Sequence, residues 1–284
     1  MRNLIYLLVF IARVLKHGMC FNRFSYTKKY SGRMVILANG PSLKDVLSKI
    51  EVDKEFENVE FTVMNFFAFD SAFQRIKPRF YCLADPMYIK RNHRYDQVEK
   101  LFHYLQDNVD WNMNLYIPKW FGRKNFLRYS SLNNPHIHII SINGGVPYNS
   151  FECLRNWLLK KNFMLPVIGT VAQLGIYVAL NSGFEKVCLY GVEHNMICSL
   201  FVNDENQLCY KEEYFYGSSA VIKPLIRNDN DQQYKIADYL LEMGVVFQSH
   251  DWLARYAESL GVKIINCTPV SMIDSYERIR KNYK

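Results

Sequence analysis

The chain has 284 residues, 49% of them hydrophobic and 22% charged, and its formal net charge is +8. This composition excludes a disordered chain, and the length allows one large domain or one domain with a small appendage. The excess of basic over acidic residues favours an anionic partner, but the absence of a block rich in Lys and Arg argues against nucleic acid as that partner.

The first predicted element is an amphipathic helix at the N-terminus. Residues 4–12, LIYLLVFIA, are apolar but too short to span a bilayer, and no small-residue cleavage site follows them. On a helix, four basic residues fall within one sector of about 100°, and they are Arg2, Arg13, Lys16 and His17. We therefore expect residues 1–32 to be a helix and basic linker lying on an anionic membrane surface. The alternative is a core helix packed on the domain.

Residues 33–284 are predicted to form one Rossmann-like α/β domain, in which apolar strands alternate with helices. The expected strands are 33–38, 60–65, 80–84, 114–117, 136–141, 186–191 and 263–267. The expected helices lie near 42–50, 66–76, 87–107, 149–162, 169–182, 233–260 and 271–281. Near-continuous apolar strands indicate a mostly parallel sheet with helices on both faces. Ligands bind such sheets beyond the carboxyl ends of the strands.

A long insertion breaks this alternation at about residues 194–232. It contains a predicted hairpin, with strands at 200–202 and 207–210, followed by a polar stretch at 217–232. Long irregular insertions after a sheet strand are typical of lids and binding loops. We expect this insertion to be a lid over the carboxyl edge of the sheet.

The junction MVILANGPSLK, residues 34–44, has a buried run that stops at four turn-forming residues. Asn39 and Gly40 tolerate the backbone angles of a tight turn, and Asn39 or Ser42 can cap the helix that follows. Backbone N–H groups at a helix start attract anions. The P-loop and G-x-G-x-x-G signatures are both absent, so the alternative to a phosphate loop is an ordinary turn between strand and helix.

A second junction and several strand ends offer further polar groups at the same edge. In PVIGTV, Gly169 permits close backbone approach and Thr170 can cap the next helix. The other strand ends carry polar side chains, which are Asn65, Asp85 and the run Glu193, His194 and Asn195. Small and hydrogen-bonding groups at five strand ends predict a nucleotide site.

The order of these motifs resembles the bacterial sialyltransferases of glycosyltransferase family 42. The resemblance runs over about residues 33–275 and rests on VILANGPSL, an Asn-ending strand, LADP, GTVAQLGIYVAL and KVCLYGVE. It is also similar to a wider set of cell-surface polysaccharide proteins with the same motif order. The resemblance implies a single Rossmann-like domain with a lid, a CMP-activated sugar as donor, and no metal or other cofactor.

The resemblance assigns roles to individual residues. Asn39, Gly40 and Ser42 match the loop that meets the donor phosphate. Asn65 and Asp85 match strand-end positions that line the nucleotide, although Asp85 replaces an amide there. Gly169 and Thr170 match a Ser-Gly pair at a helix start. The lid His of the family corresponds to Tyr214, and Tyr216 lies beside it. The family's Arg before the helix start is replaced by Pro166 or Val167.

Sugar transfer needs a base for the acceptor hydroxyl and groups that offset charge on the leaving phosphate. His194 is the strongest candidate base because it ends a strand and His titrates near neutral pH. Glu193 is the rival base, since partial burial raises the pKa of a carboxylate. Tyr214 and Tyr216 suit contacts to the leaving phosphate, and His250 is expected to be structural.

The expected function is therefore that of a membrane-peripheral glycosyltransferase. It would move sialic acid or a related 2-keto sugar acid to a glycan or glycolipid acceptor in lipopolysaccharide or capsule synthesis. Two alternatives stay open: a Mg²⁺-dependent pyrophosphokinase-like phosphotransferase, and a non-catalytic nucleotide-binding protein of envelope assembly. The sequence also leaves a homo-oligomer open.

The cysteines bear on the expected location. Seven are scattered along the chain without a C-x-x-C pair. Their odd number indicates reduced thiols in a cytosolic protein and argues against a zinc site or a disulfide framework. We expect the protein on the inner face of the bacterial cytoplasmic membrane.

Overall fold

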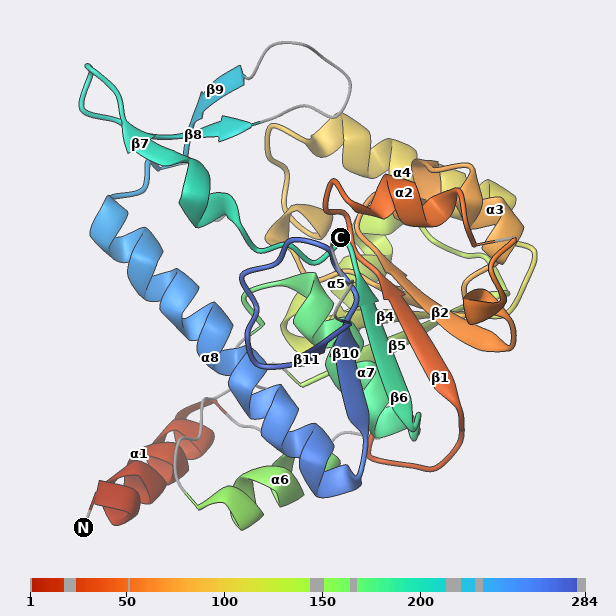
Figure 1. The fold of residues 1–284 in the computed structure, drawn as a ribbon, viewed down its shortest axis with the longest axis horizontal. Helices are drawn as coiled ribbons and strands as arrows, with labels where there is room; N and C mark the ends of the chain where they lie inside the picture. The colour runs from red at the N-terminus through yellow and green to blue at the C-terminus, as the bar shows by residue number, and fades with distance from the viewer. Residues whose placement is uncertain are drawn as a thin grey trace.

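The centre of the molecule is an eight-stranded parallel sheet flanked by helices (Figure 1). The computed structural model describes residues 2–17, 24–50, 52–143, 151–163, 168–212, 221–227 and 232–279. The strands of this sheet are β1 (Arg33–Leu37), β2 (Val59–Met64), β3 (Phe80–Cys82), β4 (Met113–Pro118), β5 (Ile137–Ile142), β6 (Lys186–Tyr190), β10 (Lys263–Asn266) and β11 (Glu277–Arg278). The predicted α/β class and its seven strands are confirmed, and the architecture is consistent with a Rossmann-like fold.

The order of the strands places a switch point at the middle of the sheet. The order is β11-β10-β6-β1-β2-β3-β4-β5, so the chain runs outward from β1 to β5 and then returns to add β6 on the other side of β1. Leu37 at the end of β1 pairs with Tyr190 at the end of β6. In open α/β sheets, ligands bind where the strand order reverses, which here is the crevice between the carboxyl ends of β1 and β6.

Helices cover both faces of the sheet (Figure 1). One face carries α2 (Leu43–Leu47), α3 (Ala72–Ile76), α4 (Tyr95–Asn108) and α5 (Arg123–Ser130). The other carries α1 (Arg2–His17), α6 (Glu152–Lys160), α7 (Val171–Ser182) and α8 (Ile236–Leu260). Each face has its own buried cluster, and residues of β1 alternate between them, with Met34 and Ile36 on the α7 face and Val35 and Leu37 on the α2 face. Apolar residues on both faces of a strand are what a parallel sheet requires.

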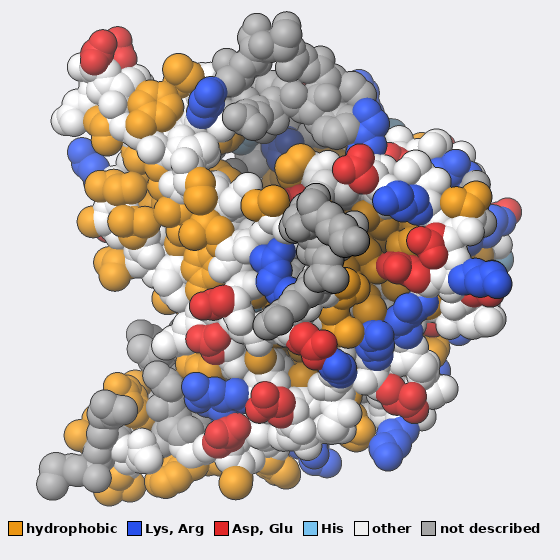
Figure 2. Space-filling model, in the orientation of Figure 1, with side chains coloured by type: hydrophobic (Ala, Val, Ile, Leu, Met, Phe, Trp, Pro, Cys, Tyr) orange, Lys and Arg blue, Asp and Glu red, His pale blue; other side chains and the backbone are white. Residues whose placement is uncertain are grey.

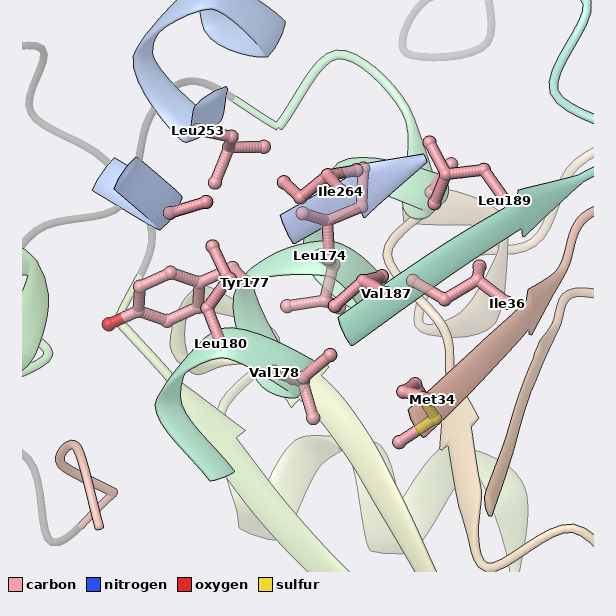
Figure 3. Packing of buried hydrophobic residues seen from close by; sticks show 14 of the residues in the cluster. Met34, Ile36, Leu174, Tyr177, Val178, Leu180, Val187, Leu189, Leu253 and Ile264 are labelled. Atoms are coloured by element: carbon pink, nitrogen blue, oxygen red, sulfur yellow. The ribbon is translucent and has the colours of Figure 1, made fainter. Parts of the chain in front are cut away.

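Helix α7 is the most deeply buried helix, since every described residue from Ala172 to Ser182 is buried. Its side chains Leu174 and Val178 pack with Ile36 and Val187 of the two central strands (Figure 3). Gly183 ends the helix in a left-handed conformation with φ of 97°, which glycine adopts without strain. Because α7 precedes the parallel strand β6, its N-terminus lies at the carboxyl edge of the sheet.

Several predicted helices differ from the observed ones. The segments 66–76 and 87–107 each begin with a short 3₁₀ turn, Phe67–Phe69 and Pro86–Tyr88, before α3 and α4. Other 3₁₀ turns are Lys54–Phe56, Lys119–Phe121 and Met196–Ser199. Helix α5 was not predicted. The helix predicted at 271–281 is wrong, because this segment runs as a loop into β11, held by Arg278, which donates to the carbonyls of Thr268, Pro269 and Ser271 at 2.8–2.9 Å.

The insertion after β6 forms a small antiparallel sheet. Its strands are β7 (Leu200–Val202), β8 (Leu208–Glu212) and β9 (Val221–Pro224), so the predicted hairpin is confirmed and β9 is an addition. Residues 213–220 and 228–231 lie outside the described part of the chain. The sheet stands out from the domain at the N-terminal end of α8 (Figure 1), and it rests on a small buried cluster of Leu208, Leu225 and Tyr239.

Helix α1 presents two different apolar stripes. Phe10 is buried, and Leu7, Phe10 and Val14 pack against the cluster on the α7 face. A second stripe is exposed, and it consists of Leu4, Leu8, Ile11 and Leu15. The helix is therefore docked on the domain and also carries an unburied apolar face. The side chains of Arg2, Arg13, Lys16 and His17 lie outside the described part. Among the described residues, no helix combines the length and apolar character needed to cross a bilayer.

Candidate functional site

The loop after β1, residues 38–42, lies at the switch point and is tied to the end of β6. Ala38 N donates to the carbonyl of Tyr190 and Gly40 N donates to that of Gly191, each at 2.9 Å. Leu43 N donates to the carbonyl of Gly40 at 3.1 Å and starts α2. These bonds extend the β1–β6 pairing past the strands and fix the predicted tight turn against its neighbour.

The group that occupies this turn is a carboxylate of the protein itself. Ser42 N donates to Glu193 Oε1 at 2.9 Å, and Glu193 is only 6% exposed. Its other oxygen, Oε2, is buried without a hydrogen-bond partner. A Cβ atom on Gly40 would lie 1.5 Å from this Oε2 and 2.5 Å from the carbonyl oxygen of Gly191. Gly40 is therefore required by close packing, and the N–H of Ser42 is already engaged.

His194 belongs to a chain of polar groups from four separate elements. Its backbone is left-handed, with φ of 51°. Its Nε2 lies 3.2 Å from Thr170 Oγ1 at the start of α7 and 3.4 Å from Nε2 of His250 on α8. His250 Nδ1 lies 2.9 Å from the hydroxyl of Tyr276 in the C-terminal segment. The structure thus joins His194 to Thr170, both sequence-predicted, and adds His250, which was expected to be structural only, and Tyr276, which sequence reasoning missed.

The imidazoles of this network are neutral at pH 7. Burial lowers the pKa of His194 to about 4. Burial holds the pKa of His250 well below its ordinary value, and repulsion between the two imidazoles when both are protonated lowers it further. The expectation of a His194 pKa near neutrality is therefore wrong, because desolvation penalises the charged imidazolium. Burial also raises the pKa of Tyr276, so its hydroxyl stays protonated.

Two proton arrangements satisfy the contacts of this network. If the hydroxyl of Tyr276 donates to His250 Nδ1, then His250 Nε2–H donates to His194 Nε2, and His194 Nδ1 carries a proton. If His250 Nδ1–H instead donates to the hydroxyl of Tyr276, then His194 Nε2–H donates toward His250 and Thr170. His194 Nδ1 then has a free lone pair. The first arrangement makes His194 Nδ1 a donor, and the second makes it a base.

The depressed pKa of His194 predicts a loss of folding stability in acid. An unfolded His titrates near 6.5 and folded His194 near 4, so between these values only the unfolded chain binds the proton. We expect this residue to cost about 2 kcal/mol of unfolding free energy between pH 7 and pH 5. Denaturant unfolding at both pH values measures the loss, and His194→Asn, which tolerates the left-handed backbone, should lose less. Equal losses in both proteins would contradict this assignment.

A cavity of about 870 Å³ lies on the α2 side of the switch point. Its walls come from the β1 loop and α2, the 3₁₀ turn Lys54–Phe56, the end of β6 and the segment after β10. Its lining includes Ser42, Asp45, Lys49, Asp53, Glu55, Phe56, Tyr190 and Arg278. The phenol of Tyr190 donates to the carboxylate of Glu55. Of these residues, sequence reasoning named only Ser42.

The remaining predicted nucleotide-binding residues are spread along the carboxyl edge. Asn65 has φ of 52°, and its side-chain oxygen lies 3.4 Å from the hydroxyl of Tyr88. Asp85 Oδ1 accepts from Met87 N at 2.9 Å and so starts a 3₁₀ turn. Asn39, Gly169 and Asn195 are exposed. Tyr214, Tyr216, Pro166 and Val167 lie outside the described residues.

The start of α7 is organised by Gln173. Its side-chain oxygen accepts from the N–H groups of Gly169 and Thr170 at 3.0 and 3.3 Å, and its amide donates to the carbonyl of Val246 on α8 at 2.7 Å. Val246 also packs so closely that a Cβ on Gly169 would lie 2.2 Å from its Cγ2. The glycine that sequence reasoning assigned to ligand approach is therefore also required for the contact between α7 and α8.

The fold and the polar groups at the carboxyl edge of the sheet together define the class of this protein. It is an α/β protein with a Rossmann-like parallel sheet, a cavity on the α2 side of the switch point, and a histidine network that contacts α7 and α8. No protein-family model matches the chain, and the curated proteins contain no match either. Within the described ranges, no three His, Cys, Asp or Glu side chains are grouped to hold a metal ion, and metal-independent transfer stays a prediction.

Proposed function

We propose that this protein is a membrane-peripheral glycosyltransferase. It would transfer sialic acid or a related 2-keto sugar acid from a CMP-activated donor to a cell-surface glycan, without a metal. The observation that carries the proposal is that the NGPS loop bonds to Glu193, the residue before His194, at the carboxyl ends of β1 and β6, with a large cavity on the α2 side. The motif resemblance described above supports the choice of a cytidine nucleotide.

The donor phosphate is best assigned to the start of α7. Glu193 already accepts from Ser42 N, and its negative charge disfavours a phosphate in the β1 loop. Helix α7 has 12 residues, and its N-terminus carries positive partial charge at the carboxyl edge. Thr170, which contacts His194, supplies a hydroxyl group there. Asn39, Asn65 and Asn195 remain the candidates for contacts to the nucleoside.

We assign base catalysis to His194 in the arrangement that leaves a lone pair on Nδ1. A neutral imidazole at pH 7 is ready to accept a proton from the acceptor hydroxyl without first losing one. Proton uptake would be assisted when the donor's phosphate charge lies nearby, because a neighbouring anion favours the charged imidazolium. Glu193 is less suited to this role because its carboxylate is buried beneath the β1 loop.

The insertion of residues 194–232 is assigned the role of lid. It begins at His194 itself, and its strands β7, β8 and β9 stand out from the domain (Figure 1). Hydrophobic side chains gather on the sheet of β7, β8 and β9 and on the N-terminal half of α8 (Figure 2). Among them, Ile222 is 59% exposed and Leu241 is 72% exposed. A small sheet with few buried residues can move as a unit at low cost.

Membrane attachment is assigned to the exposed stripe of α1. Leu4, Leu8 and Leu15 are 57–78% exposed, whereas Leu7, Phe10 and Val14 fix the helix to the domain. A helix docked on one side and apolar on another can lie in a membrane interface while the domain stays in water. The basic residues of the sequence add attraction to anionic lipid.

Removing the exposed stripe should therefore release the protein from membranes. The triple variant Leu4→Ser, Leu8→Ser and Leu15→Ser loses three side chains worth about 1 kcal/mol or more each on burial. We expect binding to vesicles of anionic phospholipid to fall by about 100-fold, measured by flotation. The matched control is Val52→Ser with Val270→Ser, which removes exposed apolar side chains elsewhere. If the triple variant floats like the control, α1 is only a structural helix.

A further inference from the structure

The cavity beside the β1 loop has a chemistry different from that of a phosphate site. Among the described residues, three carboxylates line it, from Asp45, Asp53 and Glu55, against two cations, Lys49 and Arg278. The guanidinium of Arg278 is committed to the carbonyls of Thr268, Pro269 and Ser271. It therefore builds the wall of the cavity, and its Nη1 and Nη2 groups are directed at these carbonyls. A phosphate would meet an excess of negative charge here.

The polar groups that remain in the cavity suit a ligand rich in hydroxyl groups. Ionised carboxylates only accept hydrogen bonds, so they need a ligand with donors. Sugar hydroxyls donate as well as accept, so they can satisfy the carboxylates of Asp45, Asp53 and Glu55 that line the cavity.

Aromatic side chains supply the apolar part of the same cavity. Phe56 and Tyr190 line it, with ring centroids 5.6 Å apart. Burial raises the pKa of the Tyr190 phenol, which therefore stays protonated and keeps donating to Glu55. This bond orients the Glu55 carboxylate at the cavity wall. A sugar ring has apolar C–H faces and hydroxyl groups that donate hydrogen bonds. The aromatic rings match the apolar faces, and the oriented carboxylates accept from the hydroxyl groups.

We propose that this cavity binds an uncharged, hydroxyl-rich sugar, which is the acceptor end of the glycan. The assignment as acceptor rests on the proposed glycosyltransferase function, whereas sugar binding itself does not. Ser42 belongs both to the cavity and to the β1 loop at the switch point, so a sugar bound here lies at the same carboxyl edge of the sheet as the start of α7. Glu55 is the specificity-determining residue, since it is the oriented carboxylate.

Saturation-transfer NMR on the full chain tests this proposal directly. The probes are a panel of neutral hexosides and disaccharides, with spermidine and inorganic phosphate as separate probes. We expect at least one neutral sugar to bind, and Glu55→Gln to weaken it by about tenfold because a charged acceptor is lost. Glu57→Gln is the matched control, because Glu57 is exposed and does not line the cavity. It should bind sugar like the wild type.

Several outcomes would overturn the proposal. They are no binding of any neutral sugar at millimolar concentration, sugar binding that survives Glu55→Gln, and binding of spermidine or phosphate in place of sugar. Calorimetry with CMP on the same proteins separates this proposal from the proposed function. If sugar binding is absent and CMP affinity is intact, only the proposal for the cavity is contradicted. If sugar binds and CMP does not, the proposed glycosyltransferase function is contradicted and the sugar site is supported.

Discussion

His194→Ala should lower the rate of sugar transfer by about 10²–10⁴-fold, the usual cost of losing a general base, while CMP affinity stays near that of the wild type. His194 follows β6 at the switch point and contacts Thr170 at the start of α7, where the donor phosphate is placed. The nucleoside contacts are assigned to other residues, so binding and chemistry should separate. Turnover at saturating donor and calorimetry with CMP measure the two effects.

The control for this variant is His138→Ala, which removes an exposed histidine on β5 away from the network. Glu193→Gln tests the rival base. If Glu193→Gln loses turnover and His194→Ala keeps it, the carboxylate is the base. ¹⁵N NMR of the imidazoles adds a readout that a merely structural role would not produce, since base catalysis requires an unprotonated Nδ1 on His194 at pH 7.

Gly40→Ala should destabilise the fold by about 3 kcal/mol, in the upper range for overpacking a close contact. The new methyl group would lie 1.5 Å from Glu193 Oε2 and 2.5 Å from the carbonyl oxygen of Gly191. The carboxylate can rotate away only by giving up its bond from Ser42 N. The backbone carbonyl can yield only if the β1 loop separates from β6. Denaturant unfolding measures the loss of stability.

A double-mutant cycle tests the cause of this loss. In Gly40→Ala with Glu193→Ala, the side-chain clash is gone and only the backbone contact remains, so part of the stability should return. Gly244→Ala on α8 is the matched control, because no atom lies within 4 Å of the new methyl group and alanine favours a helix. A Gly40→Ala protein as stable as the wild type would show that the loop and Glu193 are not packed as described.

The fold was predictable from sequence where the pattern is strong. The seven predicted strands are apolar runs bounded by turn residues, and parallel pairing follows from the helices between them. Helix α5 was missed because its sequence, RKNFLRYS, is mostly polar and buries only Phe126 and Ser130. Strand β11 was missed because its two residues are charged and owe their conformation to Arg278, which bonds to a loop about ten residues earlier.

The site was predictable only in part, for a physical reason. The sequence places Asn39, Thr170 and His194 at the carboxyl edge of the sheet, because parallel strands share a direction and all end at this edge. It cannot show that Glu193 fills the turn after β1, since this contact joins residues 151 positions apart. His250 and Tyr276 reach His194 through the packing of α8 and the C-terminal segment. The burial that lowers the pKa of His194 is a tertiary effect that no local pattern reveals.

Calorimetric titration of the protein with CMP, with and without EDTA, tests the central claim most directly. We expect CMP to bind, with an affinity that EDTA leaves unchanged and that Thr170→Val weakens, because the phosphate is assigned to the start of α7. Cytidine, which lacks the phosphate, should bind more weakly than CMP. Absence of CMP binding, or binding that disappears with EDTA, would contradict the proposed metal-independent glycosyltransferase.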